Sequence, residues 1–186
     1  MEPTQLNLFS TTPRLTTRTE SLVMSQDALE RWKSQIFNYQ QQVRKSEPPK
    51  QTALFELAPN HCEADSIDPF SLRIETLEFW RMPADSPGEA CLYFVIDNTL
   101  PLLLYIGETC KSNKRWKGVH DCKQYLGNYH DLHYKYGRKK AVSIAFWWDA
   151  PTQTKARQEL EKELILKWRS PFNKECWSYW GQPFGK

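Results

Sequence analysis

The sequence predicts an α+β domain in which helices flank a small antiparallel sheet of three strands. Three observations lead to this fold class. Two short apolar runs are joined by a turn, a third apolar run follows later, and stretches with helical periodicity alternate with them. Short strands mixed with helices are typical of helices packed on an antiparallel sheet. The predicted order within the domain is strand, strand, helix, strand, helix, with a helical extension in front.

The first 65 residues are predicted to hold one helix between two irregular segments. Residues 1–24 are polar and lack periodicity, so we expect a disordered tail. Residues 25–46 are predicted to form an amphipathic helix capped by Ser25. Residues 47–65, which begin near Pro48-Pro49, form a predicted linker. The apolar stripe of the helix packs either on the rest of the chain or on another chain, and its members are Leu29, Trp32, Ile36, Tyr39 and Val43.

Residues 66–186 are predicted to form the folded domain. Alternating apolar residues from Phe70 to Leu77 indicate a strand or an extended arm. The apolar runs CLYFVI and LLLYI indicate a hairpin, since the five residues between them include Asp97, Asn98 and Pro101. The predicted elements are strands at 91–96 and 102–106, a helix at 112–125, a strand at 141–148 and a helix at 154–169.

Charge is distributed unevenly along the chain. Residues 1–90 carry 9 Lys and Arg against 13 Asp and Glu, whereas residues 91–186 carry 16 against 9. A basic half of this kind indicates a polyanionic partner such as nucleic acid, although a solvated basic surface also explains it. Both explanations stay open on charge alone.

Composition argues against several classes of protein. The mean hydropathy is −0.69, and no apolar run approaches the roughly 20 residues of a membrane span. The five cysteines are odd in number and form no CxxC pair, which disfavours a disulfide framework or a structural zinc site. The start of the chain lacks an apolar signal core, so we expect a cytoplasmic protein.

One carboxylate falls on the apolar side of the last predicted helix. With about 100° per residue counted from Ala156, Glu161 lies at about 140°, inside the apolar arc that runs from Leu160 at about 40° to Ile165 at about 180°. A carboxylate on a buried face is costly unless a cation accompanies it. Two explanations remain open here: a structural salt bridge, for example to Arg115, or a metal ion.

Five short motifs follow one another between residues 91 and 173. They are Cys91-Leu92-Tyr93, Tyr105-Ile106-Gly107, Arg115 between Lys114 and Trp116, Glu161 in Glu161-Lys162-Glu163-Leu164-Ile165, and Asn173 in Pro171-Phe172-Asn173. Their order and spacing resemble the GIY-YIG nuclease family over about residues 90–175. Cys91 stands where that family usually has glycine, Glu108 follows the second motif where Lys or Ser is common, and His120 lies one residue further along than expected.

The resemblance implies a metal-dependent phosphodiester hydrolase. Glu161 would hold Mg²⁺ or Mn²⁺, and Arg115 would bind the non-bridging phosphate oxygens. Tyr93 would act as general base or proton relay. Supporting roles fall to Tyr105, which would orient water or phosphate, to Asn173, which would hold the geometry of the site, and to Glu108 and His120 as auxiliary candidates.

Basic residues near the predicted site are candidates for DNA contacts. The segment 135–140 combines lysines and an arginine with an aromatic neighbour, a combination suited to phosphates and unpaired bases. A solvated loop is the alternative. The candidate DNA-binding residues are Lys114, Lys117, Lys135, Arg138, Lys139 and Lys140.

Two short segments resemble the peptide that binds the bacterial sliding clamp. The first is Gln5-Leu6-Asn7-Leu8-Phe9, and the second, looser one is Gln51-Thr52-Ala53-Leu54-Phe55. Composition alone predicts roughly 0.05 matches to Q-x-x-L-F in this chain. In such a peptide Gln5 and Gln51 would set the register, while the apolar anchors, Leu6, Leu8, Phe9, Leu54 and Phe55, would enter a pocket. The second segment could instead pack on the domain.

These features together predict a metal-dependent DNA endonuclease recruited to the sliding clamp, the beta subunit of the DNA polymerase. We expect it to act on mismatched or branched DNA in repair or recombination, at the bacterial nucleoid. Two alternatives are a restriction endonuclease of the same family and an inactive clamp-bound DNA-binding module. A monomer and a dimer are both compatible with the sequence.

Overall fold

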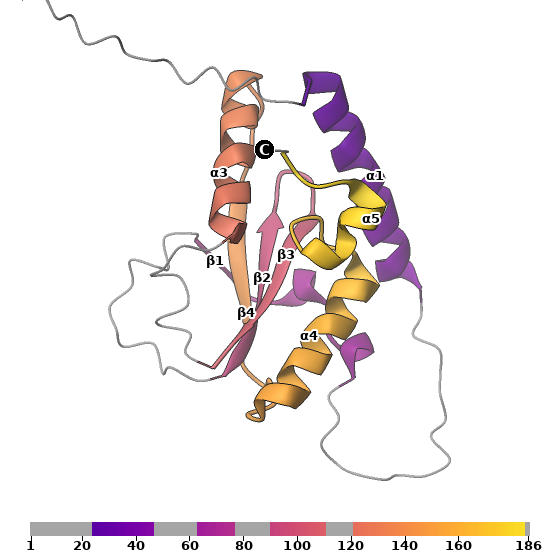
Figure 1. Ribbon diagram of the computed structural model, residues 1–186, viewed down its shortest axis with the longest axis vertical. Coiled ribbons are helices and arrows are strands. Elements are labelled where there is room, and N and C mark those ends of the chain that lie inside the picture. The colour runs from indigo at the N-terminus through magenta and orange to yellow at the C-terminus, as the bar shows by residue number, and fades with distance from the viewer. Residues whose placement is uncertain (1–23, 47–62, 77–89, 111–120, 185–186) are drawn as a thin grey trace, which may run out of the picture.

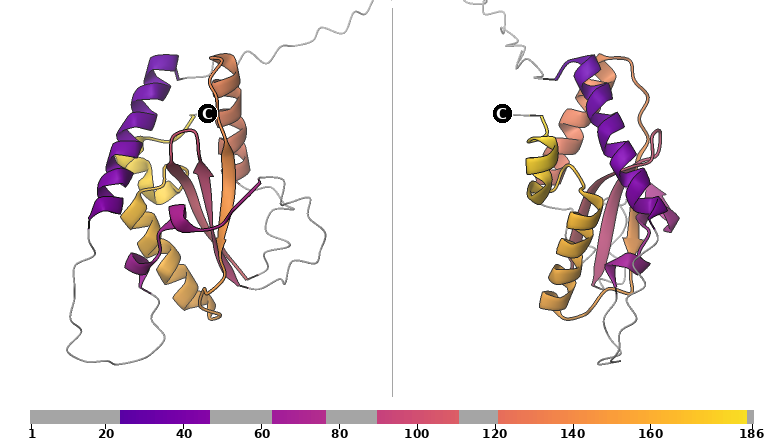
Figure 2. Two further views of the ribbon diagram at one scale, coloured as in Figure 1. Left: turned by 180° about the vertical axis from the view of Figure 1, so that it is seen from behind. Right: turned by 90° about the vertical axis from the view of Figure 1, so that its right-hand side faces the viewer.

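The computed structural model describes residues 24–46, 63–76, 90–110 and 121–184 (Figure 1). Its strands form one four-stranded antiparallel sheet in the order β1-β4-β2-β3, flanked by helices. The predicted α+β class is therefore confirmed. The sheet has one strand more than predicted, because β1 (Ile74–Thr76), where a strand or an arm was predicted, pairs with β4 (Val142–Trp147). In the back view of Figure 2, β1 runs beside β4 at the edge of the sheet.

The centre of the sheet is the predicted hairpin of β2 (Cys91–Asp97) and β3 (Leu102–Thr109). β2 pairs with β3 on one side and with β4 on the other, so all of its residues are buried. The turn is fixed by the Asp97 carboxylate, whose Oδ1 accepts hydrogen bonds from the backbone N–H and the hydroxyl of Thr99 at 3.0 and 2.7 Å.

Side chains of β2 alternate between two hydrophobic clusters, one on each face of the sheet. Tyr93 and Val95 join the cluster formed with α3 (Asp121–Lys135) and α1 (Gln26–Lys45). Leu92, Phe94 and Ile96 join the cluster formed with α4 (Thr154–Trp168). Figure 1 shows α3 and α1 on the two sides of the hairpin turn, with α4 alongside β3 and the short α5 (Trp177–Trp180) beyond it.

α1 begins as predicted and packs on its own chain. Ser25 Oγ accepts a hydrogen bond from the backbone N–H of Ala28 at 3.3 Å, which caps the helix. Leu29, Trp32 and Ile36 are buried in the core, and the helix contacts β3 and α4. Of the two outcomes considered for this apolar stripe, packing on the same chain is the one observed.

α3 continues to Lys135, so the predicted end near Tyr125 was wrong. Gly127 lies inside the helix, and the chain turns at Gly137 instead, where φ is +60°. The backbone N–H of Arg138 donates to the carbonyl of His133 at 2.8 Å, an arrangement typical of a helix that ends in a left-handed glycine. The predicted start at Ser112 lies outside the described residues. No helix within the described ranges has the length and apolar character needed to cross a membrane.

Candidate active site

A β-bulge in β3 places Tyr105 on the same face of the sheet as Tyr93. Ile96 pairs with Leu103 but Val95 pairs with Tyr105, which leaves Leu104 as the extra residue. Because successive side chains of a strand alternate between faces, Tyr105 would point to the opposite face without this extra residue. The two tyrosine rings lie 6.0 Å apart between centroids, so the bulge brings both phenols to one site.

Gly107 provides the space that the ring of Tyr93 occupies. The two residues are direct partners across β2 and β3. A Cβ atom built on Gly107 would lie 2.2 Å from both Cζ and Oη of Tyr93, a distance that no real side chain can adopt. The hydroxyl end of Tyr93 therefore rests against the backbone of β3 at residue 107.

Glu161 reaches the same part of β3 from α4. Its Oε1 accepts a hydrogen bond from the backbone N–H of Glu108 at 3.1 Å, and its side chain is half-buried. Glu108 directly follows Gly107, so the phenol of Tyr93 and the carboxylate of Glu161 meet β3 at adjacent residues. Sequence periodicity placed Glu161 inside the apolar face of α4, and the structure leaves its side chain half-buried there.

Asn173 holds β3 from the segment that follows α4. Its Oδ1 accepts from the N–H of Ile106 and its Nδ2 donates to the carbonyl of the same residue, both at 2.9 Å. The hydroxyl of Ser170 donates to the same Oδ1 at 2.6 Å. Asn173 is buried, and both of its hydrogen bonds to β3 are to backbone atoms of Ile106. These contacts fix the strand between Tyr105 and Gly107.

Tyr93, Tyr105, Glu161 and Asn173 thus converge on residues 105–108 of β3. The family comparison agrees with this convergence. Residues 89–175 match the GIY-YIG catalytic domain. This is the catalytic domain of a nuclease family, so the predicted class of enzyme, a phosphodiester hydrolase with DNA as its partner, is confirmed. No match was found among curated proteins or among solved structures.

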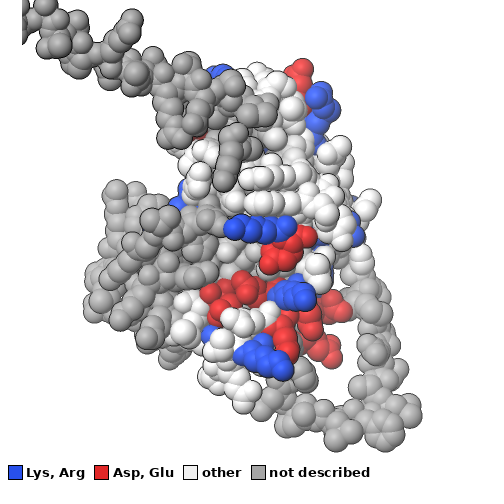
Figure 3. Space-filling view, in the orientation of Figure 1, with Lys and Arg blue, Asp and Glu red and all other residues white. Residues whose placement is uncertain are grey.

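The donor atoms at this site fit a sparsely ligated divalent cation. GIY-YIG nucleases generally depend on a divalent metal. Among the described residues, no group of three or more His, Cys, Asp and Glu side chains could hold a metal ion. Mg²⁺ commonly takes one or two carboxylates and completes its shell with water and substrate phosphate, a pattern that Glu161 can serve. Figure 3 shows acidic side chains gathered over the face where α4 runs, with basic side chains between them.

A buried ion pair between Arg157 and Glu108 lies beside this site, and sequence reasoning missed it. Arg157 Nε lies 2.6 Å from Glu108 Oε2, and the Arg157 side chain is 1% exposed. The guanidinium also donates to the carbonyls of Pro151 and Thr152. At about 100° on the helical wheel, Arg157 falls between Leu164 and Trp168, so a signal for its burial was present. This pair holds the carboxylate of Glu108, the residue that was predicted as an auxiliary member of the site.

Cys91 fills the place where the family usually has glycine. The thiol is completely buried, and burial raises its pKa to about 12, an effect that the charge of Arg157 opposes and the charge of Glu108 increases. The thiol therefore stays protonated at neutral pH, and its contribution at this position is packing rather than reactivity.

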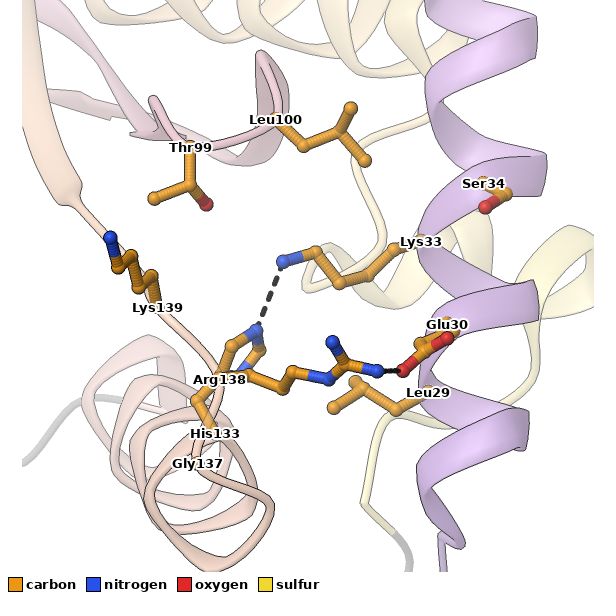
Figure 4. Close-up of a pocket in the computed structure, with 10 residues that line it drawn as sticks. All are labelled: Leu29, Glu30, Lys33, Ser34, Thr99, Leu100, His133, Gly137, Arg138 and Lys139. Atoms are coloured by element: carbon orange, nitrogen blue, oxygen red, sulfur yellow. Dashed lines mark hydrogen bonds and ion pairs between the residues drawn. The ribbon is translucent and has the colours of Figure 1, made fainter.

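The predicted basic segment lies at the other end of β2 from Tyr93. Lys135 ends α3, and Arg138 and Lys139 line a cavity of about 550 Å³ between α1, α3 and the β2–β3 turn (Figure 4). Arg138 forms an ion pair with Glu30 of α1. This end of the molecule offers cations to a polyanion, although Arg138 already has an acidic partner within the chain.

A polar network at the same cavity joins three elements. Lys33 Nζ of α1 lies 3.1 Å from Asp97 Oδ2 and 2.9 Å from His133 Nε2, and the hydroxyl of Tyr129 donates to Asp97 Oδ2 at 2.6 Å (Figure 4 shows Lys33 and His133). Burial alone would raise the pKa of Asp97, but hydrogen bonds from Thr99 and Tyr129 and the charge of Lys33 lower it to about 2. Burial lowers the pKa of His133, which therefore accepts from Lys33 as a neutral ring.

Several predicted residues lie outside the described ranges. Arg115 and His120, together with the DNA-binding candidates Lys114 and Lys117, fall in residues 111–120. The residues of the two clamp-binding segments, Gln5, Leu6, Leu8, Phe9, Gln51, Leu54 and Phe55, also lie outside the described part of the chain.

Proposed function

We propose that this chain is a metal-dependent DNA endonuclease recruited to the bacterial sliding clamp, acting on mismatched or branched DNA in repair or recombination. The observation that carries the catalytic part is the meeting of Tyr93 and Glu161 at adjacent residues of β3. A phenol from β2 and a carboxylate from α4, both held against β3, provide a proton acceptor and a ligand for a hard cation within one site.

The roles follow from the exposure of each group. Tyr93 is completely buried, so we assign it the relay of a proton rather than direct contact with DNA. Tyr105 is partly exposed on the same face, which suits it to orient the attacking water or the scissile phosphate. The water attacks phosphorus, and its proton passes through the tyrosine hydroxyls to solvent. The bond from phosphorus to the 3′ oxygen breaks, and this oxygen takes up a proton to become the 3′ hydroxyl. Arg115 binds the non-bridging oxygens and offsets the charge that develops on them.

Glu161 is the residue that would hold Mg²⁺ or Mn²⁺. A divalent cation held there would supply positive charge that offsets the charge of the phosphate and the leaving oxygen. Asn173 keeps β3 in place through the two backbone bonds of Ile106. Glu108 is already paired with Arg157, so we assign it to the support of the strand.

DNA would extend from this site toward the basic end of the domain. β2 rises about 3.3 Å per residue, so Asp97 at the turn lies roughly 13 Å from Tyr93. That distance spans about four phosphates of one DNA strand along the helix axis, at about 3.4 Å each. Lys135, Lys139 and Lys140 would bind these phosphates, with Arg138 added when it leaves Glu30.

Recruitment to the clamp rests on the two Q-x-x-L-F segments. They precede and follow α1, which packs on β3 and α4. Either peptide is thus joined to the nuclease domain through a helix that is part of its core. Two weak contacts on one chain would bind a ring-shaped clamp with avidity, because the second contact is intramolecular. Such tethering would place the enzyme at the nucleoid.

The experiment is cleavage of branched, mismatched and perfect duplex DNA by the full chain with Mg²⁺ or Mn²⁺, compared with the Glu161→Gln variant. The amide cannot hold the cation as a carboxylate does, so we expect loss of cleavage in a folded protein. Glu163→Gln, an exposed change on the same helix, is the matched control and should cut normally. Undiminished cleavage by folded Glu161→Gln would remove Glu161 as the metal ligand.

A further inference from the structure

The outer edge of β3 is closed by side chains instead of by another strand. β3 is the last strand in the sheet order, so its outward backbone groups need other partners. Leu103 bonds through both its N–H and its carbonyl to the side-chain amide of Gln40, each at 2.9 Å. Asn173 binds Ile106 in the same two-bond manner, and Glu161 accepts from the N–H of Glu108.

The spacing of these bonds marks the bulge. In a regular edge strand, the residues whose backbone N–H and carbonyl point away from the neighbouring strand recur at every second position, as Ile106 and Glu108 do. Between Leu103 and Ile106 the step is three residues, because the bulge adds Leu104 there. Tyr105 therefore lies in a short stretch between Leu103, which the side-chain amide of Gln40 holds, and Ile106, which that of Asn173 holds. The carbonyl of Leu104 also accepts from the N–H of Phe172 at 2.9 Å, so that stretch is fixed at three points.

Gln40 comes from α1, outside the residues that match the catalytic domain. It is completely buried, and its Nε2 also donates to the carbonyl of Trp168 at the end of α4, at 3.1 Å. One side chain thus links the N-terminal helix to the bulged strand and to the helix that carries Glu161. A long polar residue in such a place has no access to water, so its hydrogen bonds must all come from these partners.

We propose that Gln40 is a positioning residue for Tyr105. By holding Leu103 on one side of the bulge, as Asn173 holds Ile106 on the other, it fixes the face to which the Tyr105 phenol points. This proposal rests on the proposed function only for the role of Tyr105 in cleavage. It makes α1 part of the catalytic unit, although the family domain begins after it.

The chemistry of the amide determines the test. Gln40 must both accept a hydrogen bond and donate, and a carboxylate can only accept. In Gln40→Glu, the ionised side chain would face the carbonyls of Leu103 and Trp168 without a proton to share. Protonation of the new carboxyl group restores one donor in the same shape. The defect of this variant relative to the wild type should therefore shrink as the pH is lowered.

The experiment measures single-turnover cleavage by the full chain and by Gln40→Glu over a range of pH. We expect the rate at neutral pH to fall on the order of tenfold to a hundredfold, as for a misplaced catalytic group, with DNA affinity unchanged. Gln42→Glu makes the same chemical change at an exposed position of α1 and should cut as the wild type does. A folded Gln40→Glu protein that cuts at the wild-type rate at neutral pH would overturn the proposal.

A double-mutant cycle with Tyr105→Phe separates positioning from general support. If Gln40 acts through Tyr105, the Gln40→Glu change should have little further effect once the hydroxyl is gone. Additive losses in the double variant would overturn the proposal. An unchanged rate in Tyr105→Phe alone would instead overturn the role given to Tyr105 in the proposed function.

Amide hydrogen exchange tests the link between Gln40 and the bulge of β3 without a cleavage assay. In Gln40→Glu the N–H groups of Leu103 and Tyr105 should exchange faster, while those of α3 should keep their protection. If the wild type cuts no DNA, the proposed function fails, and this measurement still tests the link between Gln40 and the bulge. Unchanged exchange at both amides would refute that link.

Discussion

The phenol of Tyr93 lies against the backbone of Gly107, where any side chain would collide with it. A Cβ atom there would come within 2.2 Å of both Cζ and Oη. The glycine of the Tyr105-Ile106-Gly107 motif is thus required by close approach, since its φ lies outside the left-handed region. The position of Tyr93 therefore requires glycine at residue 107, directly opposite it.

Gly107→Ala should displace Tyr93 and lower cleavage on the order of a hundredfold, because a shift of about 1 Å in a catalytic group has effects of this size. Gly127→Ala is the matched control, since nothing lies within 4 Å of the added methyl group in α3. That control should stabilise the protein by about 0.5–1 kcal/mol and leave cleavage unchanged. Equal activities of the two variants would show that the place of Tyr93 does not matter.

Tyr93→Phe removes the hydroxyl and keeps the ring. We expect a folded protein with little cleavage, because the ring alone maintains the packing against α3 and β3. Arg115→Ala should lower the rate on the order of a hundredfold or more, as for a lost electrostatic stabiliser. Circular dichroism establishes folding, and single-turnover kinetics establish the rate. A Tyr93→Phe protein that cuts normally would make this tyrosine a core residue and nothing more.

Arg157→Met should destabilise the protein by about 3 kcal/mol. The change leaves the Glu108 carboxylate without its partner and two backbone carbonyls without a donor. Urea unfolding measures the loss. Combining it with Glu108→Gln removes the stranded charge, so the double variant should be more stable than Arg157→Met alone. If the double variant is the less stable of the two, the pair contributes little and the packing of Arg157 dominates.

Stability should fall in acid because of Asp97. Its pKa is about 2 in the folded protein and about 3.8 ordinarily. A depressed carboxyl pKa contributes stability above the unfolded value and loses it as the pH falls toward the folded value. We therefore expect a loss of about 2 kcal/mol between about pH 4 and pH 2. Asp97→Asn should flatten this part of the profile of unfolding free energy against pH, whereas Asp149→Asn at the surface should leave it unchanged.

Clamp binding can be tested by titration of the purified clamp. Changing Leu8 and Phe9 to Ala should abolish or strongly weaken binding, because they are the apolar anchors of the first segment. Changing Leu54 and Phe55 tests the second segment separately. Lower stability with unchanged clamp binding would make that segment part of the fold. If the intact protein does not bind at concentrations of tens of micromolar, the clamp has no place in the function.

The sequence predicts well those features that depend on local pattern. Ser25 and the spacing of Leu29, Trp32 and Ile36 were sufficient for α1, and the apolar runs were sufficient for β2, β3 and β4. The end of α3 was misjudged because helix formation tolerates Gly127, and the actual end depends on the left-handed backbone at Gly137.

The arrangement of the site is harder to predict because it depends on strand register. Nothing in the pattern LLLYI reveals a bulge at Leu104, so alternation alone would separate Tyr93 from Tyr105. Only the motif order of a known family indicated that they share a site. Gln40 and Arg157 did carry signals, since both are polar residues on the apolar faces of predicted helices. Their partners are backbone groups and an ion pair far along the chain, which periodicity does not identify.

The unpaired backbone groups of an open edge strand can form hydrogen bonds with a strand of another molecule, and many sheet proteins aggregate or dimerise in this way. Along β3 that opportunity is removed, since Gln40, Phe172, Asn173 and Glu161 already occupy the outward backbone groups. Two copies of the chain cannot merge their sheets through β3 without displacing the residues that shape the catalytic centre. Any paired form that cuts both DNA strands must therefore assemble through a different surface, and loss of the amide caps would endanger solubility together with activity.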